Sequence, residues 1–430
     1  MLSSLRPLRY RNFALIWSAA LLSNIGSWMQ TVAVGVLVTE KTGKAGWTGL
    51  VAAAAFLPIG LLSPVGGLMA DRMDRRKWLF VTTVGETVFA AALTILAATG
   101  HASPAAVTVL VFGGGAMSAI GFPAYQAMLP NLVPPGELGS AISLSSAQFN
   151  LGRVIGPALA GVAIVAGGYG WAFGINAGSF FAVLVALLFV RLPARQIEGQ
   201  VESVSKRLRD GLRATARTPA ARLAVMLISV VALTASPFIA LIPAVALKAF
   251  HSKASGTSVL VTAQGIGAVL GALALTPLAA RFGRRLVLLA DLIAVSLLLV
   301  LYGLSPALWV AAVAMVLVGS AYIGVLAGCN TIIQLNAPDA LRGRMLGLYM
   351  MALGILYPIG AIAQGTIANV VGIRAVTVAG ALILLVVVIV AFRHPILAGR
   401  DPHQPGQLLE EPPDVSLIAG LAGSPRPESG

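Results

Sequence analysis

The chain of 430 residues is too apolar and too poor in charge to fold as water-soluble domains. Charged residues make up 10% of it, where soluble domains carry about 25%. Residues of the set AVILMFWYC make up 58%, and the mean hydropathy of +0.90 excludes a wholly disordered chain. These values indicate a polytopic membrane protein, so the net charge of +14 needs an explanation other than nucleic-acid binding.

Twelve apolar runs are long enough to cross the hydrocarbon core of a bilayer, which takes about 20 residues. We predict one transmembrane helix for each, in chain order: Phe13–Leu37, Thr48–Met69, Leu79–Thr99, Pro104–Ala127, Ala141–Ala166, Trp171–Val190, Arg222–Leu247, Gly256–Ala279, Leu286–Leu304, Pro306–Cys329, Met345–Asn369 and Ala375–Phe392. The first run is too long for the core of a signal peptide, so we expect it to be retained.

Lysine and arginine gather in alternate connecting segments. One side carries Arg6, Arg9 and Arg11, the loops 71–77, 281–285 and 342–344, the segment 191–222, and the C-terminal residues. The other side carries only Lys41, Lys44, Lys248, Lys253 and Arg374. By the positive-inside rule we predict a multi-pass protein of the inner cell membrane with both termini in the cytoplasm. The same cations explain the net charge without nucleic acid, because they flank an anionic membrane surface.

Six runs, a long basic loop and six further runs suggest an internal duplication. We predict an N-terminal six-helix bundle at 1–190, a basic cytoplasmic linker at 191–221, a C-terminal six-helix bundle at 222–392 and a disordered cytoplasmic tail at 393–430. The tail is rich in proline and polar residues, which favours disorder.

Two pairs of loop motifs support the duplication. DRMDRR (71–76) follows the second run and ARFGRR (280–285) follows the eighth, while VPPGELG (133–139) matches APDALRG (337–343). Repeats in parallel orientation imply a symmetry axis along the membrane normal, with a cavity between the two halves near the midplane.

The segment GLMADRMDRR (67–76) fits the GxxxDRxxRR signature that lies between helices two and three of the major facilitator superfamily. Residues 11–43 and 338–349 resemble the branch of that superfamily that contains enterobactin-type siderophore exporters and drug efflux proteins. The resemblance implies an all-α membrane fold, in which twelve transmembrane helices form two pseudo-symmetric six-helix bundles that rock to give alternating access.

The signature supplies a candidate cytoplasmic gate, formed by Gly67, Asp71, Arg72, Arg75 and Arg76. Asp71 can pair with a neighbouring arginine or face the N-terminus of a helix in the opposite bundle, at a gain of about 0.5–2 kcal/mol. Such a gain shifts a two-state equilibrium about 2- to 30-fold. The alternative is simple anchoring of a basic loop at the membrane surface.

The matching loop of the second half, with Arg281, Arg284 and Arg285, has Ala280 in place of the acid. We therefore expect a weaker second gate and functional asymmetry between the halves.

The fifth run contains GRVIGPALAG, with Gly152, Gly156, Pro157 and Gly161 as a candidate hinge. It resembles, with one extra residue, the GxxxGPxxGG pattern of exchange-type members of the superfamily. The resemblance implies export. Close helix packing with a proline bend explains the same residues equally well.

Three ionisable residues lie within the predicted membrane helices, where charge is costly and each such residue is a functional candidate. Arg153 shares one helical face with Ser143, Ser146 and Asn150, and we expect this face to border the cavity. Arg153 could bind an anionic or catecholate-like substrate, or form a structural ion pair with Glu86 or another group. Glu86, Asp291 and Arg153 are the candidates for proton coupling, with a structural role near Arg284 or Arg285 as the alternative for Asp291.

Uncharged polar residues complete the predicted cavity. With Arg153, the candidates are Asn24, Ser27, Gln30, Thr31, Tyr125, Gln126, Asn150, Gln264, Asn330, Gln334, Tyr357 and Gln364. Each could instead form a hydrogen bond to a neighbouring helix. As a set they indicate a large, mostly apolar cavity suited to an amphiphilic organic solute.

The sequence offers no chemistry for an enzyme. It has one Cys and four His, no spacing typical of metal ligands and no phosphate-binding loop, so we expect no metal and no cofactor. We predict a monomeric, proton-coupled exporter of a small organic molecule. The alternatives are a proton symporter that imports such a solute and, more remotely, a membrane-embedded enzyme or a sensor.

Overall fold

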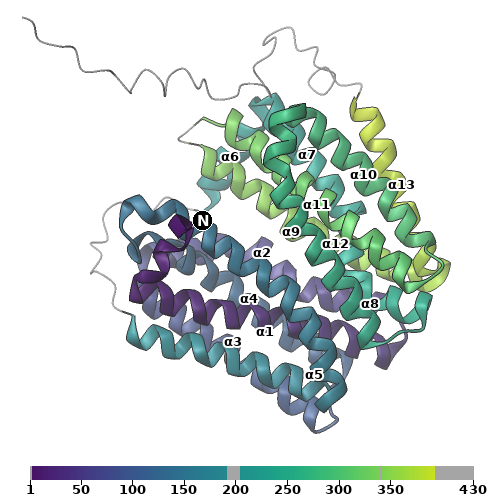
Figure 1. Cartoon of the computed structure of the whole chain (residues 1–430), viewed down its shortest axis with the longest axis horizontal. Coiled ribbons are helices and arrows are strands. Elements are labelled where there is room, and N and C mark those ends of the chain that lie inside the picture. Colours follow the sequence, from purple (N-terminus) through teal and green to yellow (C-terminus); the bar gives the residue numbers. More distant parts are fainter. Residues whose placement is uncertain (1, 191–203, 339–340, 393–430) are drawn as a thin grey trace, which may run out of the picture.

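The computed structural model describes residues 2–190, 204–338 and 341–392, and this part of the chain is helical with short connections (Figure 1). The predicted disordered tail at 393–430 lies outside the described residues. The helices are η1 (Leu2–Arg9), α1 (Arg11–Thr42), α2 (Ala45–Arg72), α3 (Arg75–Ala98), α4 (Pro104–Met128), η2 (Leu129–Asn131), η3 (Pro135–Glu137), α5 (Leu138–Phe189), α6 (Val204–Arg217), α7 (Pro219–Thr234), α8 (Pro237–Phe250), α9 (Ala254–Phe282), α10 (Arg284–Leu304), α11 (Leu308–Asn336), α12 (Arg342–Val371) and α13 (Ile373–Phe392).

The prediction of twelve transmembrane helices is confirmed in the described chain. Eleven helical segments are long and apolar enough to cross a membrane, and one of them contains the whole of α5. A straight helix of 52 residues would measure about 78 Å, more than twice the bilayer core of about 30 Å. Gly168 breaks α5 with φ 74° and ψ −174°, a conformation that glycine adopts without steric cost. The two halves of α5 match the predicted runs Ala141–Ala166 and Trp171–Val190.

The seventh predicted run, by contrast, is divided into α7 and α8. Pro237 begins α8 and has no N–H to donate to the Leu233 carbonyl. The amide of Phe238 bonds to Ala235 at 3.0 Å rather than continuing the α-helical pattern to Thr234. The side-chain amide of Gln364 on α12 donates to both freed carbonyls, at 3.1 Å to Leu233 and 2.8 Å to Thr234. The break is therefore satisfied by a neighbouring helix.

The helices form two groups. Helices α1 to α5 pack on one another, and so do α7 to α13, while α2 and α12 pack just as extensively on each other between the two groups. The groups meet where α1, α2 and α5 contact α8, α9 and α12, and we call this contact the seam. Figure 1 shows the groups side by side near α8 and spreading apart toward the N-terminus and α6. We call that end, which carries the loops after α2 and α9, the basic end, and the opposite end the far end.

Glycines close the seam from the far end to about the middle of the helices. A Cβ atom built on Gly60 of α2 would stand 2.7 Å from the backbone of Gly354 on α12, and one on Gly365 would stand 2.6 Å from the Ala45 carbonyl. Gly161 of α5 meets Ser258 of α9 in the same way, with 2.9 Å to the Ser258 hydroxyl. These positions allow backbones of opposite groups to touch, as small residues do in membrane helix pairs.

Candidate functional site

Arg153 lies midway along the first half of α5 and reaches across the seam. Its Nη2 donates to Oε1 of Gln264 on α9 at 2.8 Å. The guanidinium carbon lies 5.6 Å from the centre of the Trp28 ring on α1, a cation–π distance. One charged side chain therefore joins the two helical groups at mid-depth.

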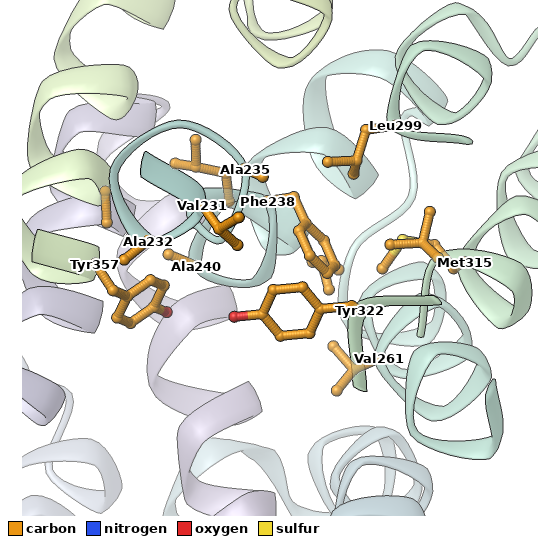
Figure 2. Close-up of a cluster of buried hydrophobic side chains, with 14 of the residues drawn as sticks. Val231, Ala232, Ala235, Phe238, Ala240, Val261, Leu299, Met315, Tyr322 and Tyr357 are labelled. Atoms are coloured by element: carbon orange, nitrogen blue, oxygen red, sulfur yellow. The ribbon is translucent and has the colours of Figure 1, made fainter. Parts of the chain in front are cut away.

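Two tyrosines of the second group lie close enough to this guanidinium to interact with it electrostatically. Tyr322 of α11 and Tyr357 of α12 are electrostatic neighbours of Arg153. Figure 2 shows their hydroxyl groups pointing toward each other within a cluster of buried side chains. The Tyr322 hydroxyl also bonds to Ser236, at the break between α7 and α8, over 2.8 Å. The site thus combines a cation, hydroxyl groups and the broken helix.

Aromatic rings enclose the site. Phe56 stands edge-on to Tyr357 at 5.3 Å between ring centres. Phe238 meets Tyr322 in the same manner at 5.6 Å, and Phe149 meets Trp28 at 6.1 Å. Such edge-to-face pairs add about 0.5–1.5 kcal/mol each beyond their buried area, so the rings around Arg153 hold defined positions.

Neither intramembrane acid is the partner of Arg153. Glu86 of α3 bonds to Ser118 of α4, and the Asp291 carboxylate lies against Gly324 of α11. Ion pairs between described residues join Arg6 to Glu137, Arg207 to Asp71 and Arg344 to Asp210. Glu86 faces α4, whereas Arg153 faces α9. The two residues therefore do not form the ion pair that the sequence allowed as an alternative.

Only some of the other predicted cavity residues lie at this site. Gln264 and Tyr357 join Arg153 at the site. Gln30 instead accepts a hydrogen bond from Asn176 in the second half of α5, at 2.8 Å, and Gln364 binds the freed carbonyls of α7. Both amides are thus occupied within their own helical groups, which is the alternative role that the sequence allowed.

Most of the remaining polar candidates lie on the helices between mid-depth and the basic end. Gln334 donates to Asn330 on α11, and Asn150 donates to the Ser146 carbonyl at 2.8 Å. Tyr125 stacks near Phe122 with 6.2 Å between ring centres. Gln126, Gln334 and Thr31 are exposed, while Asn24 and Ser27 are half-buried. Thr31 donates to the Ser27 carbonyl at 2.8 Å.

The hinge residues of α5 serve two different contacts. Gly152 and Gly156 receive α1: a Cβ on Gly152 would stand 2.8 Å from the Asn24 Cβ, and one on Gly156 would stand 2.6 Å from the Ile25 carbonyl. Gly161 instead faces α9 across the seam, and Pro157 lies buried within the continuous helix. The motif therefore packs α5 on both sides.

The arginines of the predicted gate cap helix ends of their own group. Arg75 donates to the Ala127 carbonyl at 2.6 Å, and Arg76 donates to Leu187 at 2.6 Å and Leu188 at 3.0 Å. Basic groups at helix C-termini satisfy carbonyls that lack partners. Arg72 is exposed, and nothing stands within 4 Å of a Cβ built on Gly67.

Asp71 pairs with the helix that connects the two groups. Its carboxylate lies 3.8 Å from Arg207 of α6, with both side chains partly exposed. Three residues further along α6, Asp210 accepts from Arg344 of α12 at 2.6 Å. Helix α6 therefore lies on α12 and reaches α2 at the basic end. In the second loop, Arg281 lies over the ring of Phe282 at 5.2 Å, while Arg284 is exposed and Arg285 half-buried.

Sequence reasoning missed several residues of this arrangement. Trp28, Ser236 and Tyr322 have no distinguishing neighbours in the sequence, and only their packing around Arg153 identifies them. Arg207 lay within a basic run, where nothing singled it out as the partner of Asp71.

The fold and the charged loop after α2 are those of a known protein family. The family model described as transmembrane secretion effector matches residues 2–418. The chain belongs to this family of major facilitator transporters. The family consists of transporters and not enzymes, as predicted.

Relatives of the family cover most of the chain. The multidrug efflux pump Tap of Mycolicibacterium fortuitum is 28% identical over 90% of this chain and 96% of its own length. The enterobactin exporter EntS of Citrobacter koseri is 29% identical over 78% of this chain and 80% of its own length. The resemblance to an efflux branch of the superfamily is thereby confirmed.

Solved structures of other transporters share the fold at low sequence identity. A bacterial homologue of the lysosomal transporter Spinster, in an inward-facing and occupied conformation, aligns with a TM-score of 0.72 at 15% identity, over 91% of this chain and 97% of that chain. The nucleoside transporter NupG aligns with a TM-score of 0.67 at 16% identity, over 89% of this chain and 99% of that chain. These likenesses support the fold.

Proposed function

We propose that the protein exports a small organic molecule from the cytoplasm, using a proton gradient across the inner membrane. Membership of a transporter family sets the general activity. Export and the class of substrate follow from relatives named as a multidrug efflux pump and an enterobactin exporter. The main structural support for an alternating-access mechanism is the hydrogen bond between Arg153 and Gln264, which joins the two helical groups at mid-depth.

The arrangement corresponds to one state of an alternating-access cycle. Glycine contacts close the seam from the far end to the middle, whereas the helical groups spread apart toward the basic end (Figure 1). Because the basic end is the cytoplasmic end under the positive-inside rule, this state would admit a solute from the cytoplasm. Export then requires the far end to open and the basic end to close around the same central site.

We propose that Asp71 helps to close the basic end. In the present state it forms only a long, partly exposed pair with Arg207, and such pairs contribute about 0–1 kcal/mol. A closer contact with the opposite bundle in the other state would therefore bias the equilibrium toward that state. Gly67 has open space around it here, which leaves room for an approaching helix.

Proton coupling would use one of the two intramembrane acids. Glu86 lies between α3 and α4, whereas Asp291 of α10 faces α11, the helix that carries Tyr322. Asp291 is therefore the carboxyl with the shorter structural connection to the central site. Asp291→Asn should abolish gradient-driven transport but preserve exchange of substrate down its own gradient, with Glu86→Gln as the matched variant.

Inside-out membrane vesicles test export directly. A panel of siderophores, macrolides and cationic dyes is offered with an imposed pH gradient, acid inside. We expect at least one compound to accumulate in the vesicles and to leak out when the gradient is collapsed. Accumulation only in right-side-out vesicles with an inward proton gradient would establish import by symport instead.

A further inference from the structure

Arg153 has no carboxylate partner among the described residues, although it lies at mid-depth in the membrane. Its single hydrogen-bond acceptor there is the neutral amide oxygen of Gln264. Its Nε is buried and has no hydrogen-bond partner. A charge in a setting of low polarity is strongly disfavoured unless an opposite charge compensates it. The guanidinium is therefore suited to a ligand that brings the missing negative charge.

The groups around Arg153 are arranged to receive such a ligand. Gln264 is 1% exposed, and its Nε2 donor is buried without a hydrogen-bond partner. The hydroxyls of Tyr322 and Tyr357 point toward each other (Figure 2), and both tyrosines interact electrostatically with Arg153. Trp28 and Phe56 supply aromatic surface from the first helical group. Within the described chain, the site offers several donors, aromatic walls and no acid.

We infer that Arg153, Tyr322 and Tyr357 bind the anionic group of an aromatic organic anion, a carboxylate or a phenolate, and that this group replaces the Gln264 oxygen on Arg153. The inference rests on the proposed transport function and specifies its substrate class. The adjacent rings of Trp28 and Phe56 contact the aromatic part of the ligand, and the guanidinium contacts its charged part.

The exchange of partners favours the anion. A hydrogen bond between a guanidinium and a carboxylate is roughly twice as strong as one with a neutral acceptor and is frequently bidentate. The displaced Gln264 belongs to α9, whereas Arg153 belongs to α5, so the exchange removes a bond across the seam. Binding of the anion therefore removes one contact that holds the seam closed. It favours the state in which the far end is open.

A cationic drug is the chemical opposite of this ligand, and the site disfavours it. The two intramembrane acids, Glu86 and Asp291, face α4 and α11 rather than Arg153. A cation beside Arg153 would meet like charge without an acid to offset it. The structure therefore favours aromatic acids over cationic dyes at this position.

Binding of naphthoate and of its uncharged carboxamide, naphthamide, to the purified full-length protein tests the inference. The two probes share one ring system and differ in charge. The readout is the fluorescence of Trp28, whose ring adjoins Arg153, with Trp28→Phe to identify its share of the signal. We expect wild-type protein to bind naphthoate at least about tenfold more tightly than naphthamide, a difference of about 1.4 kcal/mol.

Arg153→Gln should remove that preference, with naphthoate affinity falling about tenfold and naphthamide affinity changing less than about twofold. Arg153→Lys should restore part of it, because the charge remains while the planar fork is lost. The inference would be overturned if Arg153→Gln lowered the affinity for both probes equally or for neither. It would also be overturned if the wild-type protein bound neither probe. Circular dichroism and elution as a single species verify that each variant is folded.

Gln264→Leu supplies an independent test of the exchange. Without the competing amide oxygen, naphthoate affinity should rise several-fold while naphthamide affinity stays constant. A fall in naphthoate affinity would contradict displacement of Gln264. These binding measurements need no gradient and no transport. A protein that fails to export in vesicles but binds naphthoate selectively refutes the proposed function, and one that exports a cation with no anion preference refutes this inference alone.

Discussion

The two ends of the seam between the helical groups are built from different interactions. From about the middle to the far end, backbones touch at Gly60, Gly354 and Gly365, where an added methyl group would collide with backbone atoms. At the basic end the connection runs through α6, with Asp71 and Arg207 at 3.8 Å. Steric contact of this kind depends on shape, whereas an exposed ion pair is weak and responds to salt. The far end is therefore held closed by close packing of backbones, whereas the opening of the basic end depends on ion pairs between charged side chains.

The largest effect is expected from a methyl group placed at the middle of the seam. Gly354→Ala would press a Cβ onto Gly60, with 2.6 Å to its Cα, whereas Gly347 on the same helix has nothing within 4 Å. Gly354→Ala should therefore shift the population away from the closed far end and reduce transport about tenfold or more, at normal membrane insertion. Gly347→Ala is the matched control and should stay within about twofold of wild type. Equal behaviour of the two variants would refute the steric account.

The next effect concerns charge at the basic end. Asp71→Asn should slow transport about 2- to 30-fold, the shift that a helix-terminus contact can supply. Arg207→Gln removes the partner that Asp71 has in the present state, so it should slow transport less than Asp71→Asn. Initial rates in vesicles compare the two variants. If Arg207→Gln slows transport as much as Asp71→Asn does, then Asp71 acts only through its contact with α6, and the proposed contact with the opposite bundle is refuted.

A smaller effect, on stability, is expected where α7 ends. Gln364→Leu leaves the carbonyls of Leu233 and Thr234 without their side-chain donor. Both carbonyls are at least partly exposed, but the bilayer core offers no water to replace the donor, so the cost is about 1–3 kcal/mol. The thermal unfolding temperature in detergent should fall accordingly. Gln334→Leu is the control, because Gln334 is exposed and bonds only to Asn330 on its own helix. An unchanged unfolding temperature for Gln364→Leu would show that the break needs no donor from α12.

The smallest effect is expected for the attachment of α6. Arg344→Ala removes the 2.6 Å pair with Asp210, whose partly exposed position limits its contribution to about 0–1 kcal/mol. Hydrogen exchange along α6 should become faster while the rest of the protein is unaffected. Arg217→Ala, at the exposed end of the same helix, is the control. Unchanged exchange in α6 would mean that apolar packing alone holds this helix.

Much of the fold could be predicted because membrane helices are recognisable by their length and hydropathy. The paired runs on either side of Gly168 were separated correctly, since the stretch between Ala166 and Trp171 is rich in glycine. The break between α7 and α8 was missed. In the sequence Pro237 looks no different from Pro157 or Pro358, around which the helix continues. The freed carbonyls at Pro237 are satisfied by Gln364 of a neighbouring helix, and the sequence does not reveal this contact.

The central site could be predicted only in part. Arg153 stood out because a charge within a membrane helix is rare, and Gln264 was among the polar candidates. Tyr322 and Trp28 were not identifiable, since their role depends on contacts between helices far apart in sequence. Gln30 and Gln364 illustrate the opposite case: a polar residue in a membrane helix satisfies a neighbour as readily as it lines a cavity.

The most direct test of the account measures distances at both ends of the seam in the same protein. Spin labels on cysteines at Met73 and Phe282 report the basic end, and labels at Trp171 and Trp309 report the far end; all four side chains are exposed. The buried native Cys329 is first replaced by serine. On adding an exported substrate, the basic-end distance should shorten while the far-end distance lengthens, in the same fraction of molecules. Distances that stay fixed, or that change together in one direction, would contradict alternating access around Arg153.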